Sequence, residues 1–565
     1  MGHLLRELDV LAVDGQASGS TPAYGDLLEL GWARCSAAGL AGPVRSRWIV
    51  PRTERAIPWP VRELTGWSEA SVAEAVDERS AWAELRADLV PADPSASAPL
   101  APAPTVIHFA RFELTFLRDL CRRVDGSDQL PLDVVCLHAV AVRLFPDLPR
   151  RNIRALAGHL GHSPQLARRT AGHVEATAFI WQALLPLLEA LSVTTWTGLK
   201  AWVAEPAPRP RRGPRVYPLA VERRRALPDG PGVYRFVRRS GDVLYVGKAV
   251  SLRKRVAGHF AGRGAAGERG LEMLTQVHDV DVTETASQLE AALLETDEIK
   301  RLDPPYNVQL RAAGRQAWYA SADLRDATPA RDSVHAIGPL PSEYALFPLA
   351  ALTALVDGAA PSPALCAAAL AVPAAFAPPP ALFEEGFRAF VSDHLGSAEP
   401  TAAARLAQAS RALWLLRGRT EADTDADAQL GPADWDLARV RRRLERSLTQ
   451  TGLLMRRTRL LCLLADATVA FRERAMPAAR ALVIDAGDIR ERHDADAVMT
   501  VAAWPARAPR ARDDRQACFD AASYDRLRIL ITELRRVQDE GGDTAMRIGG
   551  HTFAPDRLAR MMLTV

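Results

Sequence analysis

The chain has 565 residues, too many for one hydrophobic core, and this length predicts about three or four domains. Its composition is 48% hydrophobic and 25% charged, and the longest apolar run, near residues 347–356, is about half of the roughly 20 residues that a membrane span needs. We therefore expect no membrane span, and the net charge of +3 agrees with an acidic polymer as partner without specifying one.

Strand-like and helix-like segments alternate in residues 1–200. Strand character is found at Val10–Val13, Leu27–Cys35 and Val106–His108, and helical apolar spacing at Phe112–Cys121, Asn152–Leu160 and Val174–Leu191. This alternation predicts an α/β layer fold for the first domain.

Motifs in the same region resemble those of the DEDDh exonucleases, the family of the polymerase proofreading subunit epsilon. Asp14 and Gln16 stand where the family has Asp-x-Glu, Glu113 where it has Asp, and Arg168 and His173 where it has His and a last Asp. The resemblance implies a ribonuclease-H-like mixed sheet with flanking helices. The family's chemistry uses two metal ions held by four carboxylates, with a neutral His as base. Because three of these five positions have lost their group, we expect an inactive exonuclease-like domain.

A Pro/Arg-rich connector is predicted at residues 201–225. Between Glu205 and Arg225 it carries seven Arg against two Glu, a composition that cannot form a core. Two interpretations stay open, a solvated spacer and a segment that contacts DNA phosphates. The second would use Arg209, Arg211, Arg212 and Arg215.

Residues 226–312 combine the chemical groups that phosphodiester hydrolysis needs. The chain has only four lysines, and three of them, Lys248, Lys254 and Lys300, lie between residues 232 and 307. Two short strand-like runs carry Tyr234 and Tyr245 and are predicted to form a β-hairpin. We expect a helix after Gly247 with Lys248, Arg255 and His259 on it, and a second, apolar helix at residues 289–299 with Glu295. Such a set offers a base, cations for the phosphate and a carboxylate ligand for a metal ion.

The order and spacing of these elements resemble the GIY-YIG nucleases, most closely the N-terminal incision domain of UvrC and its shorter homologue Cho. The resemblance implies that Tyr245 positions or deprotonates the water, that Tyr234 and Lys248 support it, and that Arg255 stabilises the phosphate. It further implies that Glu295 holds a single Mg²⁺ (or Mn²⁺) and that Asn307 orders the site. His259 departs from the UvrC pattern, which usually has Tyr there, and could serve as a base or an acid. Lys254 is a candidate DNA contact.

Residues 313–565 contain no motif that we assign to chemistry, and we expect this region to be mostly helical. The six cysteines show no metal-binding spacing, which predicts reduced thiols and a cytoplasmic location.

Together these features predict an α/β multidomain DNA endonuclease or nickase of GIY-YIG type, acting in repair incision like that of excision repair. Two alternatives stay open: a 3′–5′ exonuclease with an accessory GIY-YIG domain, and a non-catalytic DNA-binding scaffold. Gln16 and His173 argue against the first, and the complete set of Tyr, Lys, Arg, Glu and Asn argues against the second. The sequence leaves open which DNA structure or lesion is cut and whether proteins like UvrA and UvrB recruit the chain.

Overall fold

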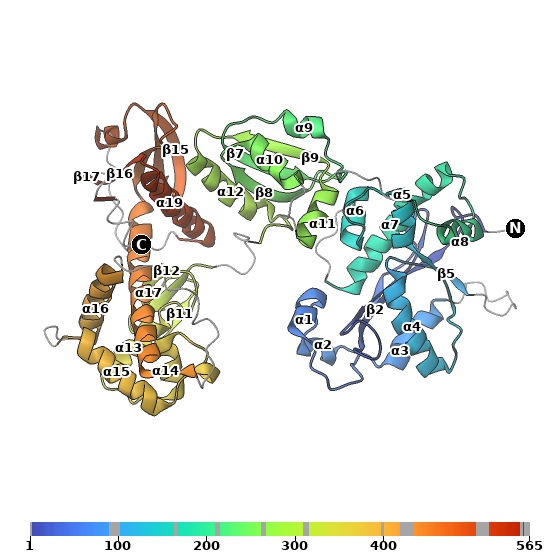
Figure 1. Ribbon diagram of the computed structural model, residues 1–565, viewed down its shortest axis with the longest axis horizontal. Helices are drawn as coiled ribbons and strands as arrows, with labels where there is room; N and C mark the ends of the chain where they lie inside the picture. The colour runs from blue at the N-terminus through green and yellow to red at the C-terminus, as the bar shows by residue number, and fades with distance from the viewer. Residues whose placement is uncertain are drawn as a thin grey trace. The chain divides into compact units, whose positions relative to one another are not determined.

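The computed structural model divides into two compact units (Figure 1). Residues 1–286 with 304–308 form the first unit, and residues 287–303 with 309–565 form the second. The structure describes residues 3–89, 102–162, 168–208, 215–261, 267–308, 316–396, 401–417, 434–503, 519–553 and 557–558. The finer division at residues 200, 225 and 312 stays a prediction.

A mixed six-stranded sheet forms the centre of residues 3–204. Its main path runs β3-β2-β1-β5-β6, and β4 pairs with β2. Strand β1 is antiparallel to β2 and parallel to β5, which is parallel to β6. The strands are β1 (Val10–Ala17), β2 (Leu27–Ser36), β3 (Gly39–Leu40), β4 (Arg45–Trp48), β5 (Ala103–Ile107) and β6 (Leu132–Cys136).

Helices cover both faces of this sheet because its strands are apolar on both sides. Val10 and Ala12 of β1 pack into one core with helices α5 to α8, whereas Leu11 and Val13 pack into the other with α3 and α4. The strands and helices predicted for this region, and its α/β layer fold, are confirmed. The helices are α1 (Trp59–Thr65), α2 (Glu69–Ala73), α3 (Glu78–Ala87), α4 (Ala110–Asp125), α5 (Leu137–Leu144), α6 (Ile153–Leu160), α7 (Thr170–Ala190) and α8 (Trp196–Ala204).

A three-stranded antiparallel sheet, in the order β8-β7-β9, forms the second part of the first unit. Its core gathers buried residues from the sheet and from helices α10 and α11, among them Phe236, Leu252 and Leu274. The elements are α9 (Val221–Arg225), β7 (Gly232–Val237), β8 (Val243–Ala249), α10 (Leu252–Phe260), α11 (Glu268–Gln276) and β9 (Asp279–Glu284).

The second unit contains two sheets as well as helices, so the expectation of a mostly helical C-terminal region overlooked its strands. A three-stranded sheet has the order β11-β10-β12, and a five-stranded sheet has the order β15-β14-β13-β16-β17. The strands are β10 (Trp318–Ser321), β11 (Ala327–Thr328), β12 (His335–Leu340), β13 (Thr468–Arg472), β14 (Ala479–Asp485), β15 (Asp488–Ala495), β16 (Asp543–Ile548) and β17 (His551–Phe553).

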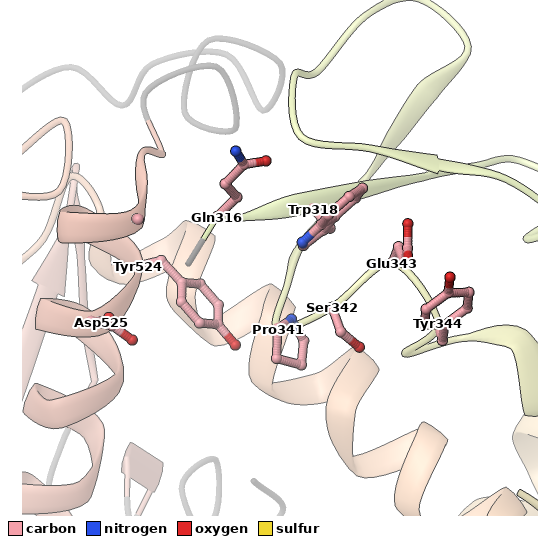
Figure 2. A pocket seen from close by; sticks show the side chains of 9 residues that line it. Gln316, Trp318, Pro341, Ser342, Glu343, Tyr344, Tyr524 and Asp525 are labelled. Carbon is pink, nitrogen blue, oxygen red and sulfur yellow. The ribbon is translucent and has the colours of Figure 1, made fainter. Parts of the chain in front are cut away.

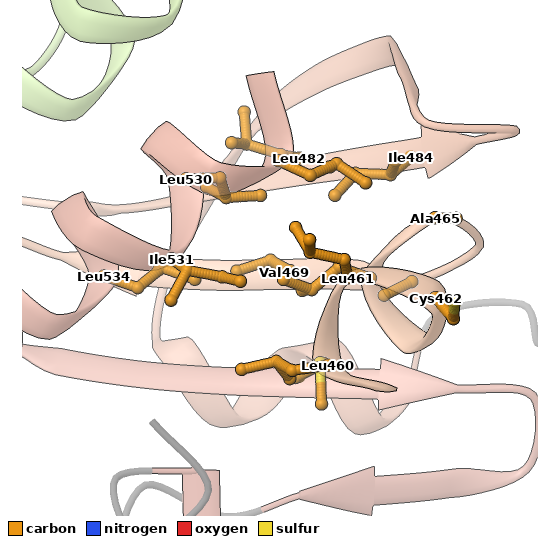
Figure 3. Packing of buried hydrophobic residues seen from close by; sticks show 14 of the residues in the cluster. Leu460, Leu461, Cys462, Ala465, Val469, Leu482, Ile484, Leu530, Ile531 and Leu534 are labelled. Carbon is orange, nitrogen blue, oxygen red and sulfur yellow. The ribbon is translucent and has the colours of Figure 1, made fainter. Parts of the chain in front are cut away.

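The long helix α17 contributes to two cores of the second unit. Its first half, including Val440 and Leu444, packs with helices α13 to α16, and its last turns pack with α19 and the five-stranded sheet. Figure 3 shows Leu461 of α17 and Leu530 of α19 facing Val469 of β13. The helices are α12 (Gln288–Leu302), α13 (Phe347–Val356), α14 (Pro363–Leu370), α15 (Pro380–His394), α16 (Ala402–Arg417), α17 (Leu437–Leu464) and α19 (Ala521–Asp539).

Two further expectations concern membranes and thiols. Among the helices described here, none is long and apolar enough to cross a bilayer. The five cysteines in the described part of the chain are free, and four of them are buried; Cys518 lies outside it.

Candidate functional site

The hairpin of β7 and β8 brings Tyr234 and Tyr245 onto one face of the sheet. In the antiparallel register Tyr234 lies opposite Gly247 and Tyr245 lies opposite Phe236, so the two tyrosines are diagonal neighbours. Their ring centroids are 6.1 Å apart. Glycine is required at 247, because a Cβ there would lie 2.5 Å from the Tyr234 hydroxyl oxygen and 2.8 Å from the Tyr245 ring.

His259 on α10 completes this aromatic group. The Tyr234 hydroxyl and His259 Nε2 are 2.7 Å apart, and the imidazole centroid lies 6.0 Å from that of Tyr245. Burial, and secondly the charge of Arg255, lower the pKa of His259 to about 4. The imidazole is therefore neutral at physiological pH, and it can accept the hydrogen bond that the buried Tyr234 phenol donates.

Helix α10 is capped by Ser251, whose hydroxyl accepts a hydrogen bond from the Lys254 backbone amide at 3.3 Å. Arg255 and His259 are one turn apart on this helix, as predicted, and the side chains of Lys254 and Arg255 are exposed. The prediction that Lys248 lies on the helix is wrong. Lys248 is a residue of β8, paired with Val233, because the strand continues to Ala249 before the helix cap.

Asn307 is attached to β8 beside Tyr245. Its side-chain oxygen accepts a hydrogen bond from the Val246 amide, and its side-chain nitrogen donates one to the Val246 carbonyl, both at 3.0 Å. The amide of Tyr306 also donates to the Leu244 carbonyl at 3.1 Å. Because these bonds flank Tyr245 in the chain, they support the predicted ordering role of Asn307.

Glu295, the predicted metal ligand, lies on α12 in the second unit, where its side chain is half-buried. This helix is anchored to α19 by Lys300, whose Nζ lies 2.7 Å from Asp525 Oδ2, and by Arg526, whose Nε donates to Asp297 at 2.9 Å. Lys300 thus serves the packing of this unit. Across the described ranges, no group of three or more His, Cys, Asp or Glu side chains is placed to hold a metal ion. A single carboxylate with water molecules is a donor set that suits Mg²⁺.

The structure describes only some of the arginines of the connector. Arg215 is exposed, whereas Arg209, Arg211 and Arg212 lie outside the described residues. Their contact with DNA stays a prediction.

The five exonuclease-like positions lie together at the end of β1. His173 Nδ1 is 3.1 Å from Asp14 Oδ2, and Gln16 Nε2 donates to the Arg168 carbonyl at 2.6 Å. Glu113 is near enough to Asp14 for the two charges to interact. The fold thus brings the predicted positions into one cluster. Arg168 contributes its backbone carbonyl to this cluster, whereas its side chain is exposed.

The charges of this cluster differ from those of a two-metal site. Burial disfavours the imidazolium, but the charge and hydrogen bond of Asp14 raise the pKa of His173 above its ordinary value. Burial, and secondly the charge of Asp14, raise the pKa of Glu113 to about 9, so this carboxyl is protonated at neutral pH. The cluster therefore pairs the Asp14 carboxyl group with the His173 imidazole beside a protonated Glu113.

Buried polar contacts hold His173 in this place. The Glu29 carboxylate, fully buried in β2, accepts hydrogen bonds from the Thr170 amide at 3.0 Å and from Arg169 Nε at 2.5 Å. These bonds fix the N-terminus of α7, one turn before His173. No local spacing indicates this role, since Glu29 and Thr170 are 141 residues apart in the chain.

The second unit contains a hollow of about 220 Å³ (Figure 2). Tyr524 of α19 and Trp318 of β10 lie on opposite sides of it, with Pro341 between them, and Glu343 is at its rim. None of its nine lining residues carries a positive charge, so the hollow is unsuited to a DNA phosphate.

Comparison with known proteins identifies the segment that carries the two tyrosines, His259 and Glu295. Residues 230–308 match the model of the UvrC-like GIY-YIG domain. The chain is similar to UvrABC system protein C of Neisseria meningitidis serogroup B, with 49% identity over 85 residues that cover 15% of this chain and 14% of the relative. It also resembles the Thermotoga maritima UvrC N-terminal endonuclease domain bound to magnesium, with 28% identity, a TM-score of 0.14 and coverage of 15% of this chain and 93% of that domain.

A relative that matches over a longer stretch is named for both exonuclease and endonuclease activity. A Mycobacterium tuberculosis (strain CDC 1551 / Oshkosh) protein named "Putative bifunctional exonuclease/endonuclease protein" is 31% identical over 261 residues. The match covers 45% of this chain and 39% of that protein. Escherichia coli exonuclease I in complex with single-stranded DNA matches with 16% identity and a TM-score of 0.28, over 33% of this chain and 42% of that one. The chain combines a UvrC-like GIY-YIG domain with an exonuclease-like region.

Proposed function

We propose that the chain is a DNA endonuclease or nickase whose chemistry belongs to the GIY-YIG domain. The observation that carries the proposal is the 2.7 Å hydrogen bond between the Tyr234 hydroxyl and His259, beside Tyr245. Because the imidazole is neutral, it can accept the hydrogen bond of the Tyr234 phenol and hold its hydroxyl group in place. Tyr245, next to this pair and only partly buried, is the group that we assign to the attacking water.

The remaining residues supply charge and order. Arg255 is exposed one turn from His259 and is assigned to the negative charge that develops on the phosphate. Asn307 holds the strand that carries Tyr245. Glu295 is the carboxylate that we expect to hold Mg²⁺ (or Mn²⁺), which when bound supplies positive charge to the leaving oxygen.

We further propose that the exonuclease-like region has no catalytic activity. A working site would present four carboxylates to two metal ions, whereas Gln16 and His173 stand at two of these positions and Asp14 is paired with His173. Gln16 uses its amide nitrogen to bond the Arg168 backbone. The mycobacterial relative is named an exonuclease as well as an endonuclease, which favours the alternative of an active exonuclease.

Cleavage assays with the purified chain test the endonuclease. Nicked, flapped, bubbled and lesion-bearing duplexes labelled at internal positions should be cut with Mg²⁺ and left intact with EDTA. Tyr245→Phe and Glu295→Gln should abolish cutting, whereas the matched controls Tyr217→Phe and Glu222→Gln, which change residues outside the proposed site, should retain it. Cutting by folded Tyr245→Phe at the wild-type rate would refute the assignment. Adding proteins like UvrA and UvrB to the lesion-bearing duplex tests the proposed repair role.

The exonuclease alternative is tested in the Glu295→Gln background. With the endonuclease silenced, we expect no release of mononucleotides from single or double strands with Mg²⁺ or Mn²⁺. Release that disappears on adding Asp14→Ala would show that the exonuclease-like region is active and that our proposal for it is wrong.

A further inference from the structure

Helix α6 of the exonuclease-like region is joined to α11 of the GIY-YIG domain by a small polar interface. Asn152 Nδ2 donates to Glu272 Oε2 at 2.6 Å, and Arg150 Nη2 lies 2.7 Å from Glu268 Oε1. His159 and His278 stack with ring centroids 5.3 Å apart. These contacts attach the exonuclease-like region to α11 and to the segment that directly follows it.

The Asn152 side chain is held in place because both its amide oxygen and its amide nitrogen form hydrogen bonds. Its side-chain oxygen caps α6 by accepting a hydrogen bond from the Ala155 amide at 3.0 Å, and its nitrogen reaches Glu272. Nearby, α6 approaches α11 so closely at Gly158 that a Cβ there would lie 2.0 Å from Gln276 Oε1. A shift of α6 would therefore displace both Glu272 and Gln276.

Glu272 and Gln276 both bind the hydroxyl of Tyr306. Tyr306 Oη donates to Glu272 Oε1 at 2.7 Å and accepts from Gln276 Nε2 at 2.6 Å. Gln276 is fully buried, and its oxygen accepts from Arg238 Nε at 3.1 Å. Both polar atoms of the Gln276 amide therefore have partners, its oxygen in buried Arg238 and its nitrogen in partly buried Tyr306.

Tyr306 precedes Asn307, which is bonded twice to Val246 of β8. Together with the bond from the Tyr306 amide to Leu244, these contacts hold the strand on both sides of Tyr245. A continuous series of hydrogen bonds thus runs from α6 through Asn152, Glu272 and Tyr306 to the strand of the proposed nuclease tyrosine.

We infer that the exonuclease-like region acts as a positioning element for the nuclease centre, with Asn152, Glu272 and Tyr306 as positioning residues that set the location of Tyr245 through Asn307. The inference rests on the proposed nuclease function. The exonuclease-like region, for which we propose no catalysis of its own, thus holds Tyr245 of the neighbouring nuclease site in place.

The test uses variants of the full chain that remove one hydrogen bond of this series and leave α6 and β8 folded. Asn152→Ser keeps a cap for α6 but is too short to reach Glu272, and Tyr306→Phe removes only the hydroxyl. Thr195→Ser, which changes the cap of α8 away from this interface, is the matched control. Arg122→Gln breaks an exposed ion pair with Asp128, outside this interface, and serves as a second control.

The first readout is cleavage kinetics with Mg²⁺. Asn152→Ser and Tyr306→Phe should each lower kcat roughly tenfold and leave KM unchanged, since a displacement of about 1 Å at a reacting group costs on the order of 10²-fold. Because both variants cut one series, the double variant should be no slower than the slower single variant. Additive losses, or an unchanged kcat in Asn152→Ser, would overturn the inference.

The second readout does not need activity. Hydrogen exchange of the peptide that contains Val243–Ala249 should accelerate in Asn152→Ser and Tyr306→Phe, because the Val246 amide is held by Asn307, and should stay as in wild type in both controls. If wild type does not cut DNA, the proposed function fails while exchange still decides the positioning role. Unchanged exchange of this peptide in folded Asn152→Ser refutes that role.

Discussion

Replacing Glu113 by Gln should stabilise the exonuclease-like region at neutral pH. Burial, and secondly the charge of Asp14, raise the pKa of Glu113 to about 9 from its ordinary 4.5. At pH 7 the native carboxyl therefore keeps a proton that the unfolded chain has lost, which favours unfolding by about 3 kcal/mol. Since the native pKa is the higher one, the stability is complete below pH 4.5 and is lost as the pH rises toward 9. A glutamine, which resembles the protonated acid in size, removes this loss.

Hydrogen exchange of β1 peptides in the full-length chain measures the effect. Between pH 6 and 8, after correction for the intrinsic exchange rate, the opening free energy of wild type should fall by about 1.4 kcal/mol per pH unit, whereas that of Glu113→Gln should stay level. The same comparison with Mg²⁺ tests the alternative of a working exonuclease, in which Glu113 would be ionised by a bound metal ion. Equal slopes for the two proteins, or an Mg²⁺-dependent gain in protection that Glu113→Gln abolishes, would refute the reasoning.

Three further predictions concern the nuclease domain and the second unit. Gly247→Ala should lower cleavage by about 10²-fold, because its Cβ would lie 2.5 Å from the Tyr234 hydroxyl oxygen; retained cleavage would show that the two tyrosines do not need this spacing. His259→Phe should reduce the rate at least about 10²-fold, and the wild-type pH–rate profile should show no inflection from this imidazole between pH 6 and 8, because its pKa is about 4. Lys300→Met deprives the buried Asp525 carboxylate of this cation and should cost about 3–5 kcal/mol, seen as faster exchange in α19; unchanged exchange would show that the ion pair is dispensable.

The errors of the sequence-based predictions have identifiable physical causes. The sequence-based prediction has a helix with Lys248 after Gly247, yet pairing with β7 extends β8 to Ala249, and helix α10 starts only at Leu252, after its cap Ser251. Strand β15 of the second unit was overlooked because this edge strand shows no apolar alternation. Five consecutive residues of β15, from 490 to 494, are exposed. A polar strand of this kind is recognised only by its hydrogen bonds to a neighbour.

The sequence by itself determined the features that depend on neighbours within one or two turns of chain. These include the strands and helices around the mixed six-stranded sheet, the hairpin with its two tyrosines, the pair of Arg255 and His259 on one helix face, and the absence of carboxylates at Gln16 and His173. Each follows from spacing and residue type alone. Only the tertiary structure decided that Asp14 is paired with His173, that Glu113 is protonated, and that Asn152 reaches the Tyr306 segment through Glu272. These features join groups about 30 to 160 residues apart in the chain, and burial then sets their charges, so no local pattern can encode them.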